Sequence, residues 1–405
     1  MMHKKHGNTR LYYESIIMEN KKTKRIFLSS LEHSAEMHCA NLIAALKEKG
    51  ADATYSGFGG QRLAEAGCEI LDDTVSRAAM TYNVLGQLGY YKKLIKQANA
   101  FFEKNTVDLV IVCDSPAFNF HIARAAKKHG VPVLFYVAPQ LWAWAPWRIH
   151  KLRRCCDKLA CILPFEAEWF GKRGIDAEFV SNPLFDEVEL DLTANFKPYS
   201  DYAPKSPKIV LLPGSRDAEI ETLWPAMLEI AAALKAKHSG AVFTACAPDD
   251  EKKAMLEEVA NDSPLSIAYE TDKLINVCRR SDYAIVASGS ATLQVAAAGC
   301  PMTVMYQSNK WMWHLVGRWL VRLPHLSLVN ILSHNELVPE FMPYFSSIQP
   351  IIQRTHGLLS TPSRMSQTSQ ALLTLVEPLT ERRASDAVAE IVCDMLCSKT
   401  RPSTA

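Results

Sequence analysis

The stretch Lys208-Ile-Val-Leu-Leu-Pro-Gly-Ser-Arg216 decides the fold of this chain. Its apolar residues predict a buried strand, the Pro-Gly pair predicts a tight turn, and a helical pattern follows over residues 219–235. A strand, a short loop and a helix in this order are typical of a parallel α/β sheet that is covered by helices.

The same alternation occurs on both sides of this stretch. We predict strands at residues 25–30, 52–57, 107–113, 131–136, 158–162 and 177–180 before it, and at residues 242–246, 265–268, 283–286 and 302–305 after it. The fold class is therefore α/β, with two Rossmann-like domains. Ligands of open parallel sheets bind at the carboxyl ends of the strands, so we expect a cleft between the two sets of ends.

The polar segment with Pro198, Pro204 and Pro207 predicts a linker between the domains. We expect a disordered N-terminal extension at 1–24, a first domain at 25–190, a linker at 191–207, a second domain at 208–360 and C-terminal helices at 361–400. The apolar spacing in Ala384–Ser398 requires a partner surface, either on the first half of the same chain or on another subunit.

Composition narrows the class of protein. The 405 residues include 45 Lys and Arg against 43 Asp and Glu, so the charge gives no reason to expect nucleic-acid binding. No segment reaches the roughly 18 uninterrupted apolar residues of a membrane-spanning helix. The 11 Cys residues lack Cys-x-x-Cys pairs or zinc-ligand spacing, which favours free thiols in a reducing cytosol and no metal site.

Two acidic residues follow predicted strands of the first domain. Asp114 stands where strand 107–113 ends, where desolvation would raise the pKa of its carboxyl group and suit it as a general base. Glu32 follows the first strand and is the second candidate catalytic residue, at the edge of the expected cleft. Each could instead cap the helix that comes next.

The loop from Pro139 to Trp147 holds three tryptophans, including Trp142 and Trp144. Their indole rings could face a sugar or an acyl chain, or pack in the core.

Two loops of the second domain are suited to phosphate. The backbone N–H groups of Gly214, Ser215 and Arg216 can hold an anion, with the Arg216 guanidinium beside them, although an ordinary turn has the same pattern. The small residues after strand 283–286 form a second such loop, consisting of Ser288, Gly289, Ser290 and Thr292. Neither loop matches Gly-x-Gly-x-x-Gly, which excludes an NAD site.

With these motifs in this order, the chain resembles the lipid-A-disaccharide synthase family, inverting glycosyltransferases of the GT-B fold. The segments that carry the resemblance are Ala64-Glu-Ala-Gly-Cys-Glu, Asp114-Ser-Pro-Ala-Phe-Asn, Tyr136-Val-Ala-Pro-Gln-Leu-Trp-Ala-Trp, Leu163-Pro-Phe-Glu, Leu212-Pro-Gly-Ser-Arg, Ala287-Ser-Gly-Ser-Ala-Thr-Leu, Pro301-Met-Thr-Val-Met-Tyr, Ser327-Leu-Val-Asn-Ile-Leu and Val338-Pro-Glu-Phe.

The resemblance implies transfer of diacylglucosamine from UDP-2,3-diacylglucosamine to 2,3-diacylglucosamine 1-phosphate (lipid X), forming a β-1,6-linked disaccharide 1-phosphate and UDP. The UDP-sugar is then a substrate, and neither a cofactor nor a metal is implied. The resemblance makes Asp114 the catalytic base and assigns Arg216 and Asn330 to the UDP side. Ser288, Gly289 and Thr292 match the loop beside the diphosphate.

Several positions depart from the family pattern. They are Leu31-Glu-His-Ser-Ala-Glu36 for a glycine-containing acidic signature, Asn83 for a carboxylate, Ser181-Asn-Pro183 for Gly-His-Pro, Gln294 for a Glu suited to the ribose, and Val329 for a Pro. Asp114 and Arg216 are kept, so we expect activity. The alternatives are a catalytically degenerate paralogue that binds a UDP-sugar or lipid, and a UDP-sugar epimerase.

Acylated substrates imply contact with a bilayer, on the cytoplasmic face of the inner membrane. Val84, Leu88, Tyr91 and Ile95 recur at helical spacing near several lysines, and residues 311–323 combine tryptophans with arginines. Both stretches could instead pack into the core. Related enzymes also suggest a homodimer in which the C-terminal helix is exchanged.

Overall fold

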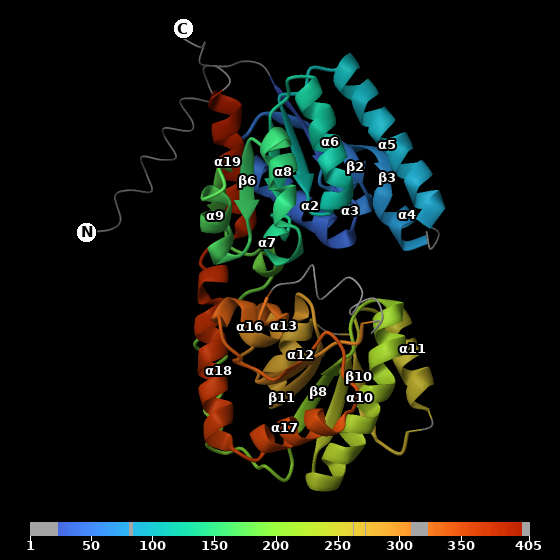
Figure 1. Ribbon diagram of the computed structural model, residues 1–405, viewed down its shortest axis with the longest axis vertical. Coiled ribbons are helices and arrows are strands. Elements are labelled where there is room, and N and C mark those ends of the chain that lie inside the picture. The colour runs from blue at the N-terminus through green and yellow to red at the C-terminus, as the bar shows by residue number, and fades with distance from the viewer. Residues whose placement is uncertain (1–22, 81–83, 262, 272, 309–322, 399–405) are drawn as a thin grey trace, which may run out of the picture. The chain divides into compact units, whose positions relative to one another are not determined.

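The computed structural model describes residues 23–80, 84–261, 263–271, 273–308 and 323–398. The chain forms two compact units. The first extends to Glu187 and takes up the chain again from Leu379, whereas the second is Val188–Pro378. Each unit is an α/β fold built on one sheet (Figure 1).

The sheet of the first unit has seven parallel strands in the order β3-β2-β1-β4-β5-β6-β7. They are β1 (Lys24–Ser29), β2 (Ala53–Gly59), β3 (Cys68–Asp73), β4 (Leu109–Cys113), β5 (Val133–Tyr136), β6 (Lys158–Cys161) and β7 (Ala177–Phe179). The sequence predicts all of them except β3, whose residues show neither continuous apolar character nor clean alternation.

Helices cover both faces of this sheet. They are α2 (His33–Glu48), α3 (Gln61–Glu65), α4 (Thr74–Met80), α5 (Val84–Lys104), α6 (Pro116–Lys128), α7 (Leu141–Trp144), α8 (Ile149–Cys155), α9 (Pro164–Gly171) and α19 (Ala384–Ser398), with short 3-10 turns η1 (Pro146–Arg148) and η2 (Pro183–Phe185). Successive strand residues point to opposite faces, so Ile26 and Leu28 pack with α2 and α19 while Phe27 packs with α5 and α6.

Helix α19 packs against α2 in the first unit (Figure 1). Val388 and Val392 are fully buried there. The Asp186 carboxylate accepts hydrogen bonds from the backbone N–H groups of Ala384 (2.7 Å) and Ser385 (2.9 Å), which satisfies the start of the helix. The sequence left open whether α19 packs on its own chain or on another subunit, and here it packs on the first half of its own chain. Exchange between subunits stays a prediction.

The sheet of the second unit is also parallel, in the order β10-β9-β8-β11-β12-β13. Its strands are β8 (Lys208–Leu212), β9 (Val242–Cys246), β10 (Ile267–Glu270), β11 (Tyr283–Ala287), β12 (Met302–Met305) and β13 (Glu340–Phe341). The described helices are α10 (Asp217–Lys237), α11 (Asp250–Ala260), α12 (Leu274–Arg280), α13 (Ala291–Ala297), α16 (Leu328–Ser333), α17 (Gln349–Leu359) and α18 (Pro362–Val376), with the short η4 (Glu377–Leu379) after them.

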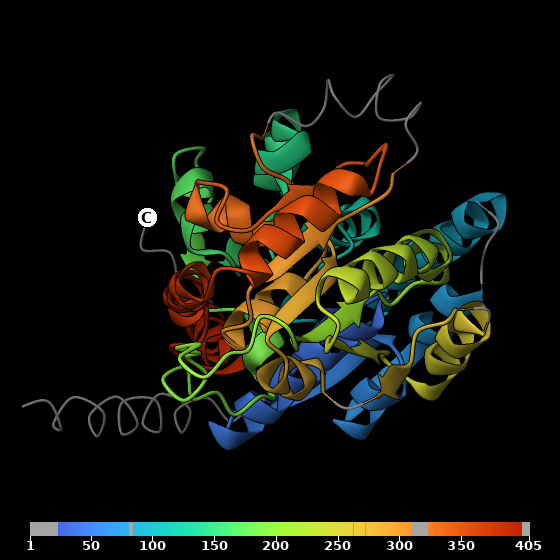
Figure 2. The ribbon, with the colours of Figure 1, turned by 90° about the horizontal axis from the view of Figure 1, so that it is seen from below.

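One face of the second sheet is covered by α10 and α17, which pack against each other (Figure 2). Ile209 and Leu211 of β8 point to this face and are buried with Trp224 of α10 and Ile351 of α17. The apolar alternation of β8 therefore fixes which side of the strand the long helix α10 covers.

The structure draws the domain boundaries differently from the sequence. The predicted linker 191–207 belongs to the second unit, where Tyr199 is buried and its hydroxyl donates to the Asp282 carbonyl (2.7 Å). Asn195 is also buried and donates to the Ala297 carbonyl (2.7 Å). Proline content alone therefore does not mark a free linker here. The expected extension at 1–24 lies outside the described residues, except that β1 already includes Lys24.

Strand order reverses once in each sheet. In the first unit β1 and β4 are neighbours, and in the second unit β8 and β11 are neighbours. The loops that leave such a pair of strands diverge to opposite faces and open a crevice at the carboxyl edge, which is where open α/β sheets bind ligands.

Truncating an apolar side chain on α19 should destabilise the first unit. We expect Ile391→Ala to lower the free energy of unfolding by about 2–5 kcal/mol, because a buried isoleucine loses its contacts and leaves a cavity. Chemical denaturation followed by circular dichroism measures the change. Asp394→Ala is the matched control, since Asp394 is exposed on the same helix. An Ile391→Ala protein as stable as the control variant would contradict the packing of α19.

Candidate functional site

The turn after β4 brings Asp114 to the point of strand reversal in the first unit. Asp114 (φ 52°) and Ser115 (φ 42°) both adopt the left-handed backbone conformation, which is uncommon for residues other than glycine. Ser115 is the residue that precedes α6. The Asp114 carboxyl group is therefore not the helix cap that the sequence left open.

The buried side chain of Asn119 holds this turn in place. Its Nδ2 donates to the carbonyl groups of Asp114 (2.7 Å) and Cys113 (3.0 Å), and its Oδ1 accepts from the Ser29 hydroxyl (2.7 Å). Asn119 thus ties the end of β4 to the end of β1. The motif Asp114-Ser-Pro-Ala-Phe-Asn119 does not reveal this role, because Ser29 is distant in the sequence.

Left-handed backbone recurs after two other strands of this sheet. Val137 (φ 67°) follows β5, and Ser181 (φ 66°) lies two residues beyond β7. A β-branched residue such as Val137 rarely takes this conformation. Strained backbone of this kind concentrates at functional sites, and here it concentrates at the carboxyl edge of the first sheet.

The electrostatics at this edge suit a base. Burial raises the pKa of the Asp114 carboxyl, the Ser115 backbone N–H lowers it, and the nearby negative charge of Glu32 raises it. Glu32 is exposed, and although it precedes α2 its side chain makes no capping hydrogen bond. The two predicted carboxyl groups therefore lie close enough to interact, and neither caps the helix that follows it.

Glu36 is a third acid at this edge and is structural. Its Oε1 accepts from the backbone N–H groups of Gly60 (2.9 Å) and Leu63 (3.0 Å), and the residue is 2% exposed. A Cβ at position 60 would lie 2.9 Å from this oxygen, which is why the loop needs glycine. Glu36 thereby anchors the loop after β2.

The tryptophan loop divides into buried and exposed rings. Trp142 donates through Nε1 to the Glu166 carboxylate (2.9 Å), and the Arg148 guanidinium lies 4.8 Å from the Trp144 ring. Both rings are partly buried against the core of the first unit. Trp147, which the sequence did not single out, is 57% exposed. Trp142 and Trp144 therefore pack partly in the core, which was one of the two alternatives. Their contact with a lipid stays a prediction.

Glu166 is the residue that orients this loop. Besides Trp142, its carboxylate accepts from the backbone N–H groups of Ile162 (3.1 Å) and Leu163 (3.0 Å), and it is 1% exposed. Burial raises the pKa of Glu166 to about 7 against these hydrogen bonds, which lower it. The glutamate three residues after Leu163 was the available signal, since a glutamate at this position can accept from the backbone N–H that precedes the helix, which is one half of a capping box.

In the second unit, the turn after β8 is built around Gly214. This glycine has φ 113°, a conformation that side chains rarely adopt. The backbone N–H groups of Ser215 and Arg216 point to one spot, where they donate to Oε2 of Glu219 (3.3 and 3.4 Å). The Arg216 guanidinium donates to Oε1 of the same carboxylate (3.0 Å). The turn thus directs its donors at a carboxylate of the helix that follows, as in one half of a capping box, and its binding of a phosphate stays a prediction.

The loop after β11 lies beside this turn, since β11 pairs with β8. Gly289 and Ser290 are exposed and Ser288 is half-buried, whereas Thr292 is buried and donates its hydroxyl to the Gly289 carbonyl (2.7 Å). Thr292 therefore shapes the loop. The half-buried Gln294 lies on α13, and its contact with a ribose stays a prediction.

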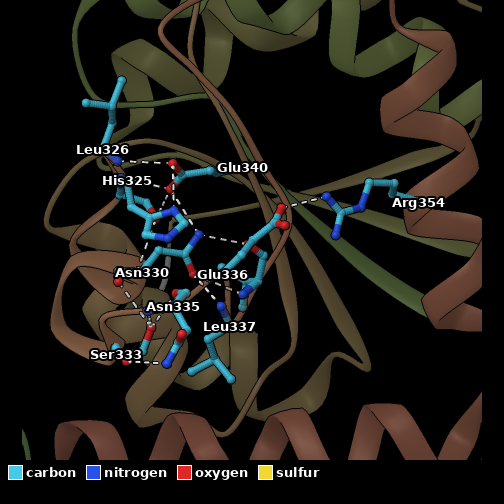
Figure 3. Close-up of polar contacts among 11 residues, drawn as sticks. His325, Leu326, Asn330, Ser333, Asn335, Glu336, Leu337, Glu340 and Arg354 are labelled. Carbon is cyan, nitrogen blue, oxygen red and sulfur yellow. Dashed lines mark hydrogen bonds and ion pairs between the residues drawn. The ribbon is translucent and has the colours of Figure 1, made fainter. Parts of the chain in front are cut away.

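Asn330 is fully buried, and its side chain folds the loop that follows α16 (Figure 3). Its Oδ1 accepts from the backbone N–H groups of Leu337 (2.9 Å) and Val338 (3.0 Å). Its Nδ2 donates to the Val338 carbonyl (2.9 Å) and to Glu340 (3.0 Å). The amide has no capacity left for a nucleotide in this arrangement, so we assign Asn330 a positioning role instead of the direct one predicted.

Glu340 is the centre of the same network (Figure 3). Its carboxylate accepts from the backbone N–H groups of Leu326 (3.0 Å) and Ser327 (3.1 Å), and from the Ser327 hydroxyl (2.6 Å). His325 lies 3.6 Å away. These four interactions fix residues 325–327, which precede α16. Helix α16 packs against α13 and so supports the loop after β11.

The predicted membrane face of α5 is mixed. Leu88 is 54% exposed, whereas Tyr91 packs on Phe118 (5.0 Å between ring centroids) and Ile95 packs on the core. The side chain of Val84 and the stretch 309–322 lie outside the described residues. Within the described part of the chain, every helix is too short or too polar to cross a bilayer, and no cluster of three or more His, Cys, Asp or Glu could hold a metal.

Comparison with known proteins identifies relatives. A family model described as lipid-A-disaccharide synthetase matches residues 26–392. A lipid-A-disaccharide synthase from Geobacter sulfurreducens is 30% identical over 381 residues, covering 94% of this chain and 99% of the relative.

Solved structures show the fold. Acinetobacter baumannii MurG superposes with a TM-score of 0.57 at 13% identity, covering 92% of this chain and 99% of the other. The UDP-GlcNAc 2-epimerase from Neisseria meningitidis superposes with a TM-score of 0.53, also at 13% identity and with the same coverage. Both units of the chain thus have the GT-B arrangement of strands and helices that the sequence predicts.

The buried Glu166 should make stability depend on pH. Because folding raises its pKa from 4.5 to about 7, the folded chain binds more protons than the unfolded chain between these values. Stability should therefore fall by up to about 3 kcal/mol as pH rises through this range. Chemical denaturation at several pH values measures the slope, which Glu166→Gln should flatten. Glu168→Gln, on the exposed side of the same helix, is the control and should keep the wild-type slope. A Glu166→Gln protein with the wild-type slope would contradict this prediction.

Proposed function

The chain belongs to the lipid-A-disaccharide synthase family of glycosyltransferases, and we propose that it joins two acylated glucosamine units. The donor is UDP-2,3-diacylglucosamine and the acceptor is 2,3-diacylglucosamine 1-phosphate (lipid X). The products are a β-1,6-linked disaccharide 1-phosphate and UDP.

Asp114 is the proposed base. Its carboxylate takes the proton of the acceptor 6-hydroxyl while that oxygen attacks the anomeric carbon of the donor, and the bond from this carbon to the diphosphate breaks with inversion. The observation that carries the assignment is the raised pKa of a carboxyl group held in a strained turn at the reversal of strand order. A raised pKa makes the carboxylate a better proton acceptor.

The second unit is the proposed site for UDP. The leaving diphosphate gains negative charge as the bond breaks, and preorganised donors stabilise such charge. The backbone N–H groups of Ser215 and Arg216 and the Arg216 guanidinium are the donors already aimed at one spot. The exposed loop Ser288–Ser290 lies on the neighbouring strand end. We propose that these groups stabilise the negative charge on the leaving diphosphate, and that no cofactor is needed.

The departures from the family pattern leave this proposal intact. Glu36, the lengthened acid of the altered signature, supports a loop and takes no part in the proposed chemistry. Asn182, in place of a histidine, caps η2 by accepting from the Leu184 backbone N–H (3.1 Å). Both substitutions therefore concern loop geometry, and a degenerate paralogue or an epimerase is not favoured.

Because both proposed substrates carry acyl chains, we expect the reaction to take place at a bilayer surface. The exposed Leu88 on α5 and the exposed Trp147 are the described residues that suit such an interface, and the Arg148 guanidinium on the Trp144 ring adds a positive charge in the same loop. We propose peripheral association with the cytoplasmic face of the inner membrane.

Replacing the proposed base should stop the reaction without affecting nucleotide binding. We expect wild-type protein to form the coupled lipid from UDP-diacylglucosamine and lipid X, detected by mass spectrometry. Asp114→Asn should lower kcat/KM by about 100- to 10,000-fold. UDP binding by calorimetry should persist, because Asp114 lies in the first unit. Asp176→Asn, a change at an exposed acid of that unit, is the control. Normal turnover by Asp114→Asn would refute the assignment, and no product from wild type would refute the function.

Glu32 should tune the acid limb of the pH profile. The negative charge of Glu32 raises the pKa of Asp114, so Glu32→Gln should lower that pKa. The acid limb of kcat/KM, where the base becomes protonated, should then move to lower pH. Glu103→Gln, on the exposed side of α5, should leave the limb in place. An unmoved limb in Glu32→Gln would show that Glu32 does not act on the base.

A further inference from the structure

The predicted diphosphate site already holds an anion that belongs to the chain. Glu219 lies in the first turn of α10, and its carboxylate receives two backbone N–H groups and the Arg216 guanidinium. These are the donors that a phosphate would use. In this structure, every one of them is directed at Glu219.

The contact geometry places Glu219 at the centre of the turn. A Cβ added at Gly214 would lie 2.5 Å from Glu219 Oε2, so the carboxylate fills the space that the absent side chain leaves. The Glu219 side chain is 14% exposed, whereas Arg216 is 73% exposed. The acid is therefore seated in the turn, and the arginine reaches over it from solvent.

The charged groups near the turn are paired in this state. Arg216 is paired with Glu219, and Asp217 in the same helical turn is paired with Lys252 (2.7 Å), which also contacts Glu251 (3.0 Å). An incoming diphosphate would gain the full attraction of Arg216 only after Glu219 gives up its position. The backbone distances of 3.3 and 3.4 Å are long for hydrogen bonds, which makes these contacts weak and easily exchanged.

We propose that Glu219 is an internal competitor that the donor diphosphate displaces. This inference rests on the proposed function, because it assumes that the turn after β8 takes the diphosphate of UDP. Glu219 then sets the affinity for donor and product alike, since both carry this group. It also keeps the turn and Arg216 ordered between turnovers, and it retakes the site when UDP leaves.

The test compares UDP and uridine binding by calorimetry. Glu219→Gln keeps a hydrogen-bond acceptor but removes the charge, so UDP should bind about tenfold more tightly. Uridine lacks the diphosphate and should bind equally to both proteins. Glu221→Gln removes the same charge from an exposed position on α10 and should leave UDP affinity unchanged.

If the Glu219→Gln protein fails to fold, a second variant still tests the proposal. Glu219→Asp keeps the charge on a side chain shortened by one methylene, which no longer reaches all three donors, so it should also tighten UDP binding. In steady-state assays of the folded variant, the donor KM and the UDP inhibition constant should fall together.

Two results separate the inference from the function on which it rests. If wild type binds UDP and forms product while folded Glu219 variants bind UDP equally or more weakly, Glu219 only orients Arg216 and the inference is overturned. If wild type and all variants bind neither UDP nor donor, the proposed function fails with it. Tighter UDP binding with unchanged uridine binding supports the inference.

Discussion

The hydrogen bonds of one buried amide, Asn119, hold together the part of the first unit on which the proposed chemistry depends. It joins the last residue of β1 to the turn after β4, across the place where strand order reverses. The left-handed backbone of Asp114 and Ser115 costs free energy that ordinary loops avoid. The Asn119 side chain bonds to both strand ends at once and thereby keeps that turn in place.

Buried glutamates hold other loops in place in the same way. Glu36, Glu166 and Glu340 each accept two backbone N–H groups from a loop near a sheet, and each is largely shielded from water. A carboxylate can hold several donors at fixed angles, which a hydroxyl or an amide does less well. Glu219 has the same form but sits where a ligand phosphate is expected. The chain thus uses one device both to build loops and to occupy a binding site.

Much of the fold follows from local pattern. Apolar strands that end in Asp114 or in Pro213-Gly214 predict their own loops, because strand, turn and helix signals are all local. The glutamate contacts escape such analysis, since Glu36 meets Gly60 and Glu340 meets Leu326 only after folding. Burial is equally non-local.

Asn330 illustrates the limit of motif matching. A motif identifies this residue as important, yet in the folded chain its amide holds the loop after α16. The segment 191–207 differs from its prediction in another way. Its prolines suggest a free linker, yet the ring of Tyr199 within it is buried. In both cases the residue type is informative, and the partner decides the role.

The chain enters the second unit at Val188 and returns to the first at Leu379, so the first unit is discontinuous in sequence. During synthesis on the ribosome, the first sheet and α2 emerge long before α19, so the apolar cluster that contains Leu42 and Ile43 of α2 is completed only when α19 arrives. A nascent chain therefore exposes part of this apolar surface until α19 has emerged. Closing the first unit with a helix that follows the whole second unit in sequence delays the burial of this surface, and transiently exposed apolar surface of this kind promotes aggregation.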